Sequence, residues 1–377
     1  MRRGIKGDDK VKIDKIETFR VAVPLTKPFK TALRTVEVAD TIFVKVECDN
    51  GIVGWGEAPP TVVITGDSLL SIESSINSVL KPFLLNKNLL HYEAIFQGIH
   101  AILVGNTSAK AAVDMALYDC LAQHCKLPLY QFLGGYKNQL ETDFTVSVND
   151  PAEMGEDAAS YVEKGFNVLK VKVGKDEAAT DLIRIQEVRK RVGKDIKIRL
   201  DANQGWTPKE AIRIISKMED MGLDIELVEQ PVKADDINGL KQVTDAVDTL
   251  IMADESIFSP KQAFHVLKTR SADLINIKLM KAGGIYKAQA INQLAEVCGV
   301  ECMVGSMIET RLGITAAAHF AASKKNITRF DFDAPLMLAK EVVEGGIRYN
   351  GRKITFPTST GLGIQHIHLG GGVPIGS

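Results

Sequence analysis

Apolar and polar residues alternate in the first part of the chain, in the pattern of half-buried strands. The alternation covers residues 16–24 and 41–47, and Asp49-Asn50-Gly51 then provides a turn into residues 53–57. A period of two places successive side chains on opposite faces of a sheet. The pattern therefore predicts a small antiparallel sheet between residues 12 and 57.

Between residues 68 and 133 the spacing of apolar residues changes to that of helices. Residues 109–118, Ala-Lys-Ala-Ala-Val-Asp-Met-Ala-Leu-Tyr, contain small side chains that indicate close helix packing. Together with the strands before them, these helices predict a first domain of the α+β class.

Beyond residue 140 the sequence repeats a cycle of an apolar strand, a loop, an amphipathic helix and the next strand. The expected strands are residues 144–148, 168–173, 196–201, 225–229, 250–254, 274–278, 301–305 and 328–331. They recur at about the length of one βα unit, so they predict a closed barrel better than an open sheet.

Three of the loops contain a recognisable helix start. Asp150, Thr207 and Ser259 are each followed by proline and, at the third position, by Glu or Gln, which is the sequence of a capping box with proline in the first turn. These signals identify the end of each strand that leads into a helix. In a (β/α) barrel, the active site is assembled at that end.

Composition and charge exclude several classes of protein. The 377 residues contain 46 Lys and Arg against 47 Asp and Glu, a net charge of −1, which provides no general attraction to nucleic acid or to an anionic membrane. The five cysteines include no Cys-x-x-Cys pair, which favours a reducing cytoplasm. No apolar stretch is long enough to span a membrane. Residues 1–11 are expected to form a disordered leader, and residues 365–377, with His366 and His368, a flexible tail.

Charged residues stand at the strand ends that should meet at the barrel mouth. They are Lys170, Lys172, Asp201, Glu229, Asp254, Lys278, Asp331 and Asp333. A buried charge must be paired, hydrated or bound to a metal. Asp201, Glu229 and Asp254 come from neighbouring strands without His or Cys among them, an oxygen donor set that favours Mg²⁺ over zinc. Simple hydration of each carboxylate is the alternative.

The lysines are arranged as two candidate bases on opposite sides of a substrate. Lys170 and Lys172 lie two residues apart on one strand and share a face, whereas Lys278 comes from the other side of the barrel. The adjacent like charges of Lys170 and Lys172, together with a metal cation, should favour the neutral amine that a base requires. The alternative is that the lysines only pair with the carboxylates.

These motifs resemble those of the enolase superfamily, in the muconate lactonizing enzyme subgroup. The resemblance runs from about residue 12 to residue 363 and rests on Lys170-Val171-Lys172, Asp201-Ala202-Asn203-Gln204, Val228-Glu229-Gln230-Pro231, Ala253-Asp254-Glu255-Ser256 and Asn276-Ile277-Lys278-Leu279-Met280-Lys281-Ala282-Gly283-Gly284. It implies an α/β fold with a modified (β/α)7β, TIM-like barrel at residues 139–344. An α+β capping domain would occupy residues 12–138, with residues 345–364 returning to it. The resemblance further implies Lys172 and Lys278 as catalytic bases and Mg²⁺ as the cofactor.

Asp331-Phe332-Asp333 at the eighth strand bears on the substrate. Two carboxylates on one face add negative charge beside a metal that already has three ligands, so they require a cation. The motif resembles the Asp-x-Asp of dipeptide epimerases, which holds the N-terminal ammonium group of the substrate. Helix capping or hydration of the two aspartates is the alternative.

Residues 27–35 in the first domain resemble the specificity loop of the L-Ala-D/L-Glu epimerases. In that family an arginine receives the carboxylate of the glutamate side chain, for which a guanidinium is well shaped. Arg34 stands at the matching position, although a surface loop can carry an arginine for solubility alone. By the same resemblance, Thr145, Lys170, Ser306 and Ile308 are expected to bind substrate.

The resemblance implies a Mg²⁺-dependent 1,1-proton transfer on a dipeptide of the L-Ala-L/D-Glu type. One lysine would remove the α-proton of the C-terminal residue, and the other would reprotonate the resulting ene-diolate on the opposite face. N-succinylamino acid racemases and o-succinylbenzoate synthases share the scaffold, and an inactive barrel that only binds ligands is the rival from another class. A small-molecule substrate, a homo-oligomer and a cytoplasmic role in cell-wall peptide metabolism are expected, without nucleic-acid or membrane partners.

Overall fold

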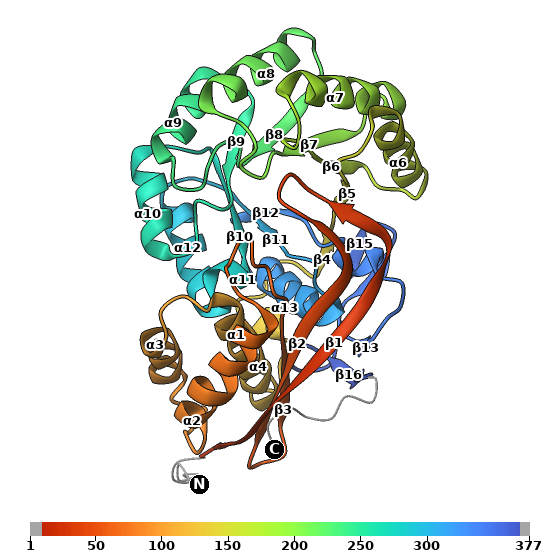
Figure 1. Ribbon diagram of the computed structural model, residues 1–377. Helices are drawn as coiled ribbons and strands as arrows, with labels where there is room; N and C mark the ends of the chain where they lie inside the picture. The colour runs from red at the N-terminus through yellow and green to blue at the C-terminus, as the bar shows by residue number, and fades with distance from the viewer. Residues whose placement is uncertain (1–9, 370–377) are drawn as a thin grey trace.

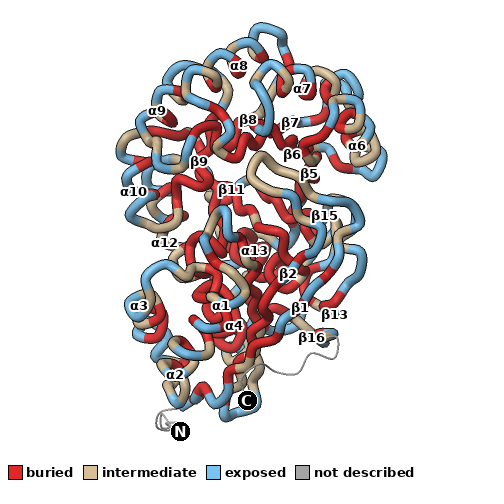
Figure 2. The backbone as a smooth tube through the Cα atoms, in the orientation of Figure 1, coloured by how far each residue is buried: buried red, intermediate tan, exposed pale blue. Residues whose placement is uncertain are grey.

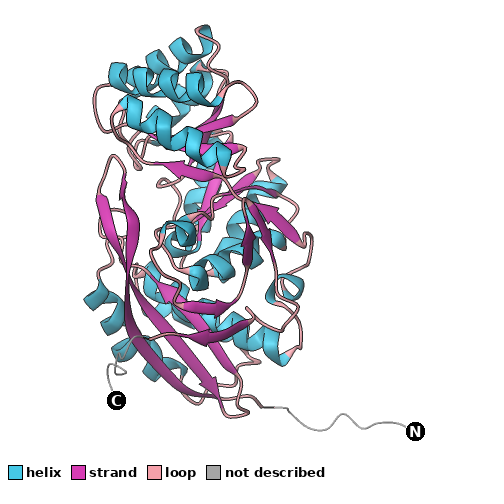
Figure 3. Ribbon diagram, turned by 90° about the vertical axis from the view of Figure 1, so that its right-hand side faces the viewer, coloured by secondary structure: helices cyan, strands magenta, loops and turns pink. Residues whose placement is uncertain are grey.

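The computed structural model describes residues 10–369, in which a barrel sits above a capping domain (Figure 1). The capping sheet is antiparallel in the order β1 (Ile13–Lys30), β2 (Thr35–Cys48) and β3 (Val53–Ala58). Strands β1 and β2 pair from Ile13 opposite Cys48 to Lys30 opposite Thr35, with a shift of register between Pro24 and Phe29. The predicted sheet and its turn are thus present, and the hairpin is long enough to reach the barrel (Figure 3).

Helices cover one face of the capping sheet. They are α1 (Leu69–Ser74), a π-helical turn at Ser75–Leu80, α2 (Lys81–Leu84), α3 (Tyr92–Ile102), α4 (Thr107–His124) and α5 (Leu129–Phe132). Helix α4 lies directly on β3, because a Cβ on Gly54 or Gly56 would stand 2.1 Å from the Ala116 carbonyl oxygen or 1.9 Å from that of Ala112. Only glycine allows this approach of helix and strand backbones.

Eight parallel strands form the barrel in sequential order. They are β5 (Phe144–Val146), β6 (Val168–Lys172), β7 (Lys197–Asp201), β8 (Ile225–Glu229), β9 (Leu250–Ala253), β10 (Leu274–Lys278), β11 (Cys302–Gly305) and β12 (Ile327–Phe330). The Asp143 N–H donates to the Phe330 carbonyl at 3.3 Å, which brings the first and last strands together. The predicted strands and the fold class are confirmed, with end points that differ by at most two residues.

A helical connection follows each barrel strand except the last. These are α6 (Pro151–Glu163), α7 (Ala178–Val192), α8 (Pro208–Asp220), α9 (Ile237–Ala246), α10 (Pro260–Thr269), α11 (Leu279–Ala282) with α12 (Ile285–Val297), and α13 (Arg311–Ala322). Each described helix is too short or too polar to cross a membrane.

The three predicted helix starts are present, but only one forms a complete capping box. At α8, Thr207 and Glu210 exchange both capping hydrogen bonds. Asp150 instead accepts from the Ala152 N–H, one residue earlier than a box requires. Ser259 accepts from the Gln262 N–H, but the Gln262 side chain accepts from the Phe258 N–H and the Ser259 hydroxyl rather than from the Ser259 N–H. The expectation of three capping boxes is therefore wrong for two of them.

The C-terminal region packs back onto the rest of the chain. It contains the 3-10 turn η2 (Ala334–Met337), β13 (Val343–Gly345), β14 (Arg348–Asn350), β15 (Lys353–Thr355) and β16 (Ile364–Ile367). Strand β15 pairs with β4 (Gln139–Glu141), and the Leu362 N–H donates to Asp119 of α4.

The two chain ends only partly match the expected leader and tail. Residues 365–367 belong to β16, paired with β13, and His368 contacts Glu344 at 2.7 Å, so the start of the expected flexible tail is ordered by strand pairing. Val11 is also buried, at the end of the expected leader. Residues 1–9 and 370–377 of these two segments lie outside the described residues, and the division into domains stays a prediction.

The barrel interior changes from apolar to charged along its strands. Leu227, Met252, Leu274 and Met303 form a small apolar cluster. Because strand side chains repeat every two residues, the same faces of β8 and β10 carry Glu229 and Lys278 further along. Buried residues are concentrated in the barrel interior and in the interior of the capping domain (Figure 2). The charged groups therefore gather at the carboxyl ends of the strands, where a (β/α) barrel holds its active site.

Candidate active site

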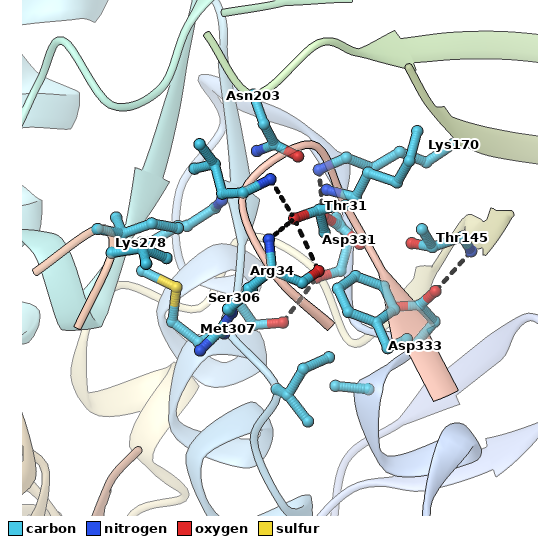
Figure 4. A pocket seen from close by; sticks show the side chains of 17 residues that line it. Thr31, Arg34, Thr145, Lys170, Asn203, Lys278, Ser306, Met307, Asp331 and Asp333 are labelled. Carbon is cyan, nitrogen blue, oxygen red and sulfur yellow. Dashed lines mark hydrogen bonds and ion pairs between the residues drawn. The ribbon is translucent and has the colours of Figure 1, made fainter. Parts of the chain in front are cut away.

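A pocket lies at the carboxyl ends of the barrel strands and is covered by the capping domain (Figure 4). The capping domain contributes Phe29, Thr31, Leu33, Arg34, Val63 and Ile64. The barrel contributes Thr145, Lys170, Lys172, Asn203, Lys278, Ser306, Met307, Ile308, Asp331, Asp333 and Ala334. All the predicted substrate-binding residues and both predicted bases thus line one pocket.

Arg34 reaches the pocket from the tip of the β1–β2 hairpin. The Thr31 N–H donates to the Arg34 carbonyl at 2.9 Å, and the Thr31 hydroxyl accepts from the N–H groups of Leu33 and Arg34. These bonds fix the turn. Burial lowers the pKa of Arg34, and no carboxylate of the described chain pairs with its guanidinium. A half-buried cation without an ionic partner is suited to receive an anionic group of a ligand.

The hairpin tip is fastened to the barrel beside this pocket. The Val148 N–H donates to the Lys30 carbonyl at 3.1 Å, and the Lys30 ammonium donates to the Asn149 side chain at 2.7 Å. Lys27 pairs with Glu153 at 2.8 Å and Asp157 at 2.6 Å on α6. The position of Arg34 over the barrel mouth is therefore set by contacts outside the pocket.

Buried lysines and carboxylates form one network beneath the pocket. Lys170 Nζ lies 3.0 Å from Asp201 Oδ2 and 2.8 Å from Glu229 Oε2. Lys172 Nζ contacts Asp201 Oδ2 at 2.6 Å. Lys278 Nζ contacts Asp254 Oδ2 at 2.7 Å from β10, which stands opposite β6 in the strand order. The two predicted bases therefore flank the pocket from opposite sides.

The predicted metal ligands are neighbours but do not form a metal site as the side chains stand. No three His, Cys, Asp or Glu side chains of residues 10–369 are placed so that they could hold one ion. Lys170 bridges Asp201 and Glu229, while Lys281 contacts Asp254 Oδ1 at 2.6 Å. Buried carboxylates need positive charge, and here ammonium groups provide it.

The donor set nevertheless fits a hard divalent cation. Asp201, Glu229 and Asp254 are at most 1% exposed and offer only oxygen. The Asn276 side chain donates to Glu229 Oε1 at 2.7 Å and orients it. Burial and then Asp201 raise the pKa of Glu229 to about 7, so the cluster holds more negative charge than its lysines balance easily.

The pKa of Lys170 and that of Lys278 are both raised, which differs from the neutral amines expected of bases. Burial would lower the pKa of Lys170, but Asp201, Asp331 and Glu229 outweigh it and hold that pKa well above its usual value. Asp254 and Glu229 likewise raise the pKa of Lys278 against burial. The expectation included a metal cation beside the lysines, whereas here the carboxylates within 3 Å of Lys170 favour its charged form. Lys170, Lys172 and Lys278 all pair with carboxylates here, and the role of Lys172 and Lys278 as bases stays a prediction.

Asp331 and Asp333 both face the pocket but differ in their partners. Asp331 Oδ2 accepts from Lys170 Nζ at 2.8 Å, so it already has a cation, contrary to the expectation that both aspartates lack one. Asp333 Oδ2 accepts from the Thr145 N–H at 2.6 Å. Burial and the charge of Asp331 raise the pKa of Asp333 to about 7. A further cation beside Asp333 would stabilise its ionised form.

Several pocket residues were missed by sequence reasoning. Phe29 lies with its ring centroid 5.7 Å from Lys172 Nζ, and Ile64 comes from a loop with no strand-end signal. Asn203 was visible in the Asp201 motif but received no role. It adopts a φ of 42°, which an asparagine tolerates, and donates to Glu255 at 3.2 Å. The Asp201 motif could have identified Asn203, and the specificity-loop resemblance of residues 27–35 could have identified Phe29, but no pattern in the sequence indicated Ile64.

Comparisons with known proteins agree with this geometry. Residues 15–134 match the model of the mandelate racemase/muconate lactonizing enzyme N-terminal domain, and residues 153–367 match the enolase C-terminal domain-like model. The chain is 69% identical to the L-Ala-D/L-Glu epimerase of Bacillus subtilis, over 94% of this chain and 97% of that protein. It is 50% identical to the L-Ala-D/L-Glu epimerase of Clostridium acetobutylicum, over 92% and 97%.

Solved structures of epimerases are also similar to this chain. A substrate-liganded complex of the Bacillus subtilis L-Ala-D/L-Glu epimerase superposes with a TM-score of 0.94, covering 94% of this chain and 99% of that chain at 69% identity. A dipeptide epimerase from Enterococcus faecalis V583, complexed with Mg and the dipeptide L-Leu-L-Tyr, superposes with a TM-score of 0.91 at 44% identity, covering 94% and 100%.

Proposed function

Because this chain belongs to the mandelate racemase/muconate lactonizing enzyme family, with its enolase-like C-terminal domain, we propose that it is an L-Ala-D/L-Glu epimerase. One observation carries the proposal. Lys172 and Lys278 flank, from opposite sides, a pocket that offers carboxylates at Asp331 and Asp333 and, at Arg34, a guanidinium that pairs with no carboxylate of residues 10–369.

The charges of the pocket match the charges of L-Ala-L-Glu. The N-terminal ammonium of the dipeptide would lie against Asp333, which pairs with no cation among the described residues, with Asp331 beside it. The glutamate side chain would pair with Arg34. Ser306 and Ile308 line the remaining wall, and Thr145 holds Asp333 through its N–H. These contacts would place the α-carbon of the glutamate between the two lysines.

The reaction is the transfer of one proton between opposite faces of that α-carbon. A neutral lysine, Lys172 or Lys278 according to configuration, removes the proton. The ene-diolate is then reprotonated by the ammonium of the other lysine, which gives the epimer. Lys170 adds positive charge where negative charge develops. Closure of the pocket by the hairpin keeps water from competing for the proton.

Mg²⁺ is the proposed cofactor, held by Asp201, Glu229 and Asp254. When bound, it would stabilise the negative charge of the substrate carboxylate during proton removal. The ion pairs of the two lysines support a cation at this place. Lys172 and Lys278 each lie within 2.7 Å of a carboxylate, at Asp201 and Asp254, and a cation bound there would share those oxygens with them.

The alternatives fit the pocket less well. An N-succinylamino acid or an o-succinylbenzoate precursor would bring a carboxylate toward Asp331 and Asp333, which would repel it. A barrel that only binds ligands would have no need for two buried lysines facing each other across the pocket. The proposed epimerase reaction gives a role to both aspartates and to both lysines.

The experiment is to incubate the purified protein with L-Ala-L-Glu and follow the appearance of L-Ala-D-Glu by NMR. We expect approach to an equilibrium of the two epimers, loss of activity in excess EDTA and recovery with Mg²⁺. N-succinyl-L-glutamate is the matched control and should not racemise. Full activity in EDTA would contradict the metal assignment, and faster turnover of the N-succinyl compound would contradict the dipeptide assignment.

Two finer properties also belong to the proposal. Cytoplasmic location is supported by the cysteines of the described chain, all of which are free thiols. Assembly into a homo-oligomer, and a role in the metabolism of cell-wall peptides, are supported by family membership. Light scattering during gel filtration would test the oligomer.

A further inference from the structure

Two glutamates that the proposed mechanism does not use meet where the capping domain touches the barrel. Glu57 lies in β3, and Glu309 lies two residues before α13. Glu57 is 0% exposed and Glu309 is 3% exposed. Two buried carboxylates at one domain boundary require an explanation, because two neighbouring negative charges out of water are strongly unfavourable.

Glu57 is surrounded by hydrogen-bond donors of the barrel. Its Oε1 accepts from the Thr310 N–H at 2.9 Å. Its Oε2 accepts from the Thr310 hydroxyl at 2.7 Å and from the Gly313 N–H at 2.7 Å. The capping domain thus provides a carboxylate to the first turn of α13, where the helix dipole and the donors favour negative charge. Glu57 is the member of the pair that is suited to be ionised.

Glu309, in contrast, is suited to be protonated. Its Oε1 accepts from the Met307 N–H at 2.9 Å, but its buried Oε2 has no hydrogen-bond partner among the described residues. A Cβ placed on Gly313 would lie 2.3 Å from Glu309 Oε2 and 3.1 Å from Glu57 Oε2, so the two oxygens border the same small space. A proton on Glu309 Oε2 would turn this unpaired acceptor into a donor toward Glu57.

The surroundings favour such a proton at neutral pH. Burial raises the pKa of Glu309 to about 8, with the charge of Glu57 as the next cause. Lys278 of β10 acts in the opposite direction, and the Met307 N–H also favours ionisation. On the side of Glu57, burial raises the pKa, whereas Thr310, Gly313 and Thr41 of β2 lower it.

We propose that Glu57 and Glu309 share one proton across the domain boundary, and that this proton holds residues 306–308 in the position that binds substrate. The link to the pocket is the hydrogen bond from the Met307 N–H to Glu309 Oε1. The second half of the proposal rests on the proposed function, which places Ser306 and Ile308 against the dipeptide. Glu57 and Glu309 are positioning residues, because neither lines the pocket.

The proposal has a specific consequence at alkaline pH. Above about pH 8, Glu309 loses its proton, the two carboxylates repel each other and the segment at 306–308 shifts. Dipeptide affinity should fall by roughly tenfold between pH 7 and pH 9.5, the size expected if bound substrate holds the proton about one pKa unit more tightly. The turnover number kcat, which describes the substrate already bound, should change less over the same pH range.

The shared proton can be tested without any substrate, through thermal unfolding of wild type and Glu309→Gln. Glu309 has a folded-state pKa raised above its unfolded value near 4.5, so its stabilising contribution is present at low pH and is lost as pH rises toward 8. Glutamine stays neutral and keeps a donor. The Tm difference between variant and wild type should therefore grow from pH 5 to pH 8 and then level off. A difference that stays constant with pH would overturn the proposal.

The effect on the pocket is tested by calorimetric binding of L-alanyl-α-methylglutamate in Mg²⁺ from pH 6.5 to 9.5. The glutamate residue of this compound has no α-proton, so it cannot be epimerised. Glu309→Gln should bind it nearly as wild type does at pH 7, and both Glu309→Gln and Glu57→Gln should lose the alkaline weakening. Asp114→Asn is the matched control, because Asp114 is a buried carboxylate that reaches from α4 to the Ile285 N–H of α12. It should keep the alkaline weakening.

The outcomes separate the two claims. Alkaline weakening that persists in both glutamine variants, or that is absent from wild type, would overturn the positioning role. If no protein binds the dipeptide at any pH while the Tm difference behaves as expected, the proposed function fails and the positioning role fails with it, but the shared proton stands.

Discussion

Replacing Arg34 should change which dipeptides the enzyme accepts. Arg34 is held over the pocket by the turn at Thr31 and has no ionic partner in the described chain. If it pairs with the side chain of a substrate glutamate, then Arg34→Ala removes that contact only for acidic dipeptides. We therefore expect a selective loss of activity toward L-Ala-L-Glu.

The size of the loss follows from the burial of Arg34. Truncating one partner of a buried charge pair costs about 2 to 5 kcal/mol, and Arg34 is only half-buried, so about 2 to 3 kcal/mol applies. Since 1.4 kcal/mol is a factor of ten, kcat/KM for L-Ala-L-Glu should fall roughly 30- to 140-fold. L-Ala-L-Leu should lose little, because its side chain never had an ionic partner.

The assay is kcat/KM for both dipeptides, measured by polarimetry on wild type, Arg34→Ala and Arg34→Lys. Lysine keeps the charge but not the planar fork, so Arg34→Lys should fall between the other two for L-Ala-L-Glu. An equal loss for both dipeptides in Arg34→Ala would refute the reasoning and show that Arg34 supports the loop. A wild-type preference for L-Ala-L-Leu would refute the glutamate assignment.

Three further results are expected. Lys172→Ala and Lys278→Ala should each abolish epimerisation, and exchange of the α-proton of a single epimer in one variant would identify its remaining base; near wild-type rates in both would make the lysines structural. N-acetylation of L-Ala-L-Glu should lower kcat/KM by roughly 100-fold or more, because Asp333 then lacks its cation, whereas equal turnover would remove that role. Gly56→Ala should lower the free energy of unfolding by about 1 to 3 kcal/mol or prevent folding, since the new methyl group meets the backbone oxygen of Ala112; unchanged denaturant unfolding would contradict the close packing.

The barrel could be predicted because each of its units repeats the same local signals. Strands such as β8 and β10 were predicted with the correct end points, since apolar runs that end in a charged residue have a clear boundary in the sequence. Capping geometry was less predictable. Ser259 and Gln262 have the residues of a capping box, yet the Gln262 side chain accepts from the Phe258 N–H and not from the Ser259 N–H, a choice that depends on backbone angles absent from the sequence.

The site was predictable where it stands on strand ends and unpredictable where distant segments meet. Lys170 and Asp331 are 161 residues apart, and nothing in either motif shows that they form an ion pair. The same limit applies to Phe29 over Lys172 and to Glu57 beside Glu309. Contacts between the capping domain and the barrel depend on the docking of two domains, which local patterns do not encode.

The most direct test of the account is epimerisation of L-Ala-L-Glu in deuterated water with Mg²⁺, analysed by mass spectrometry and NMR. Removal of a proton by one lysine and its return from another predicts one deuterium in each product molecule, at the α-carbon of the glutamate and not at that of the alanine. Product that forms without deuterium, or deuterium at the alanine α-carbon, would contradict proton transfer between Lys172 and Lys278.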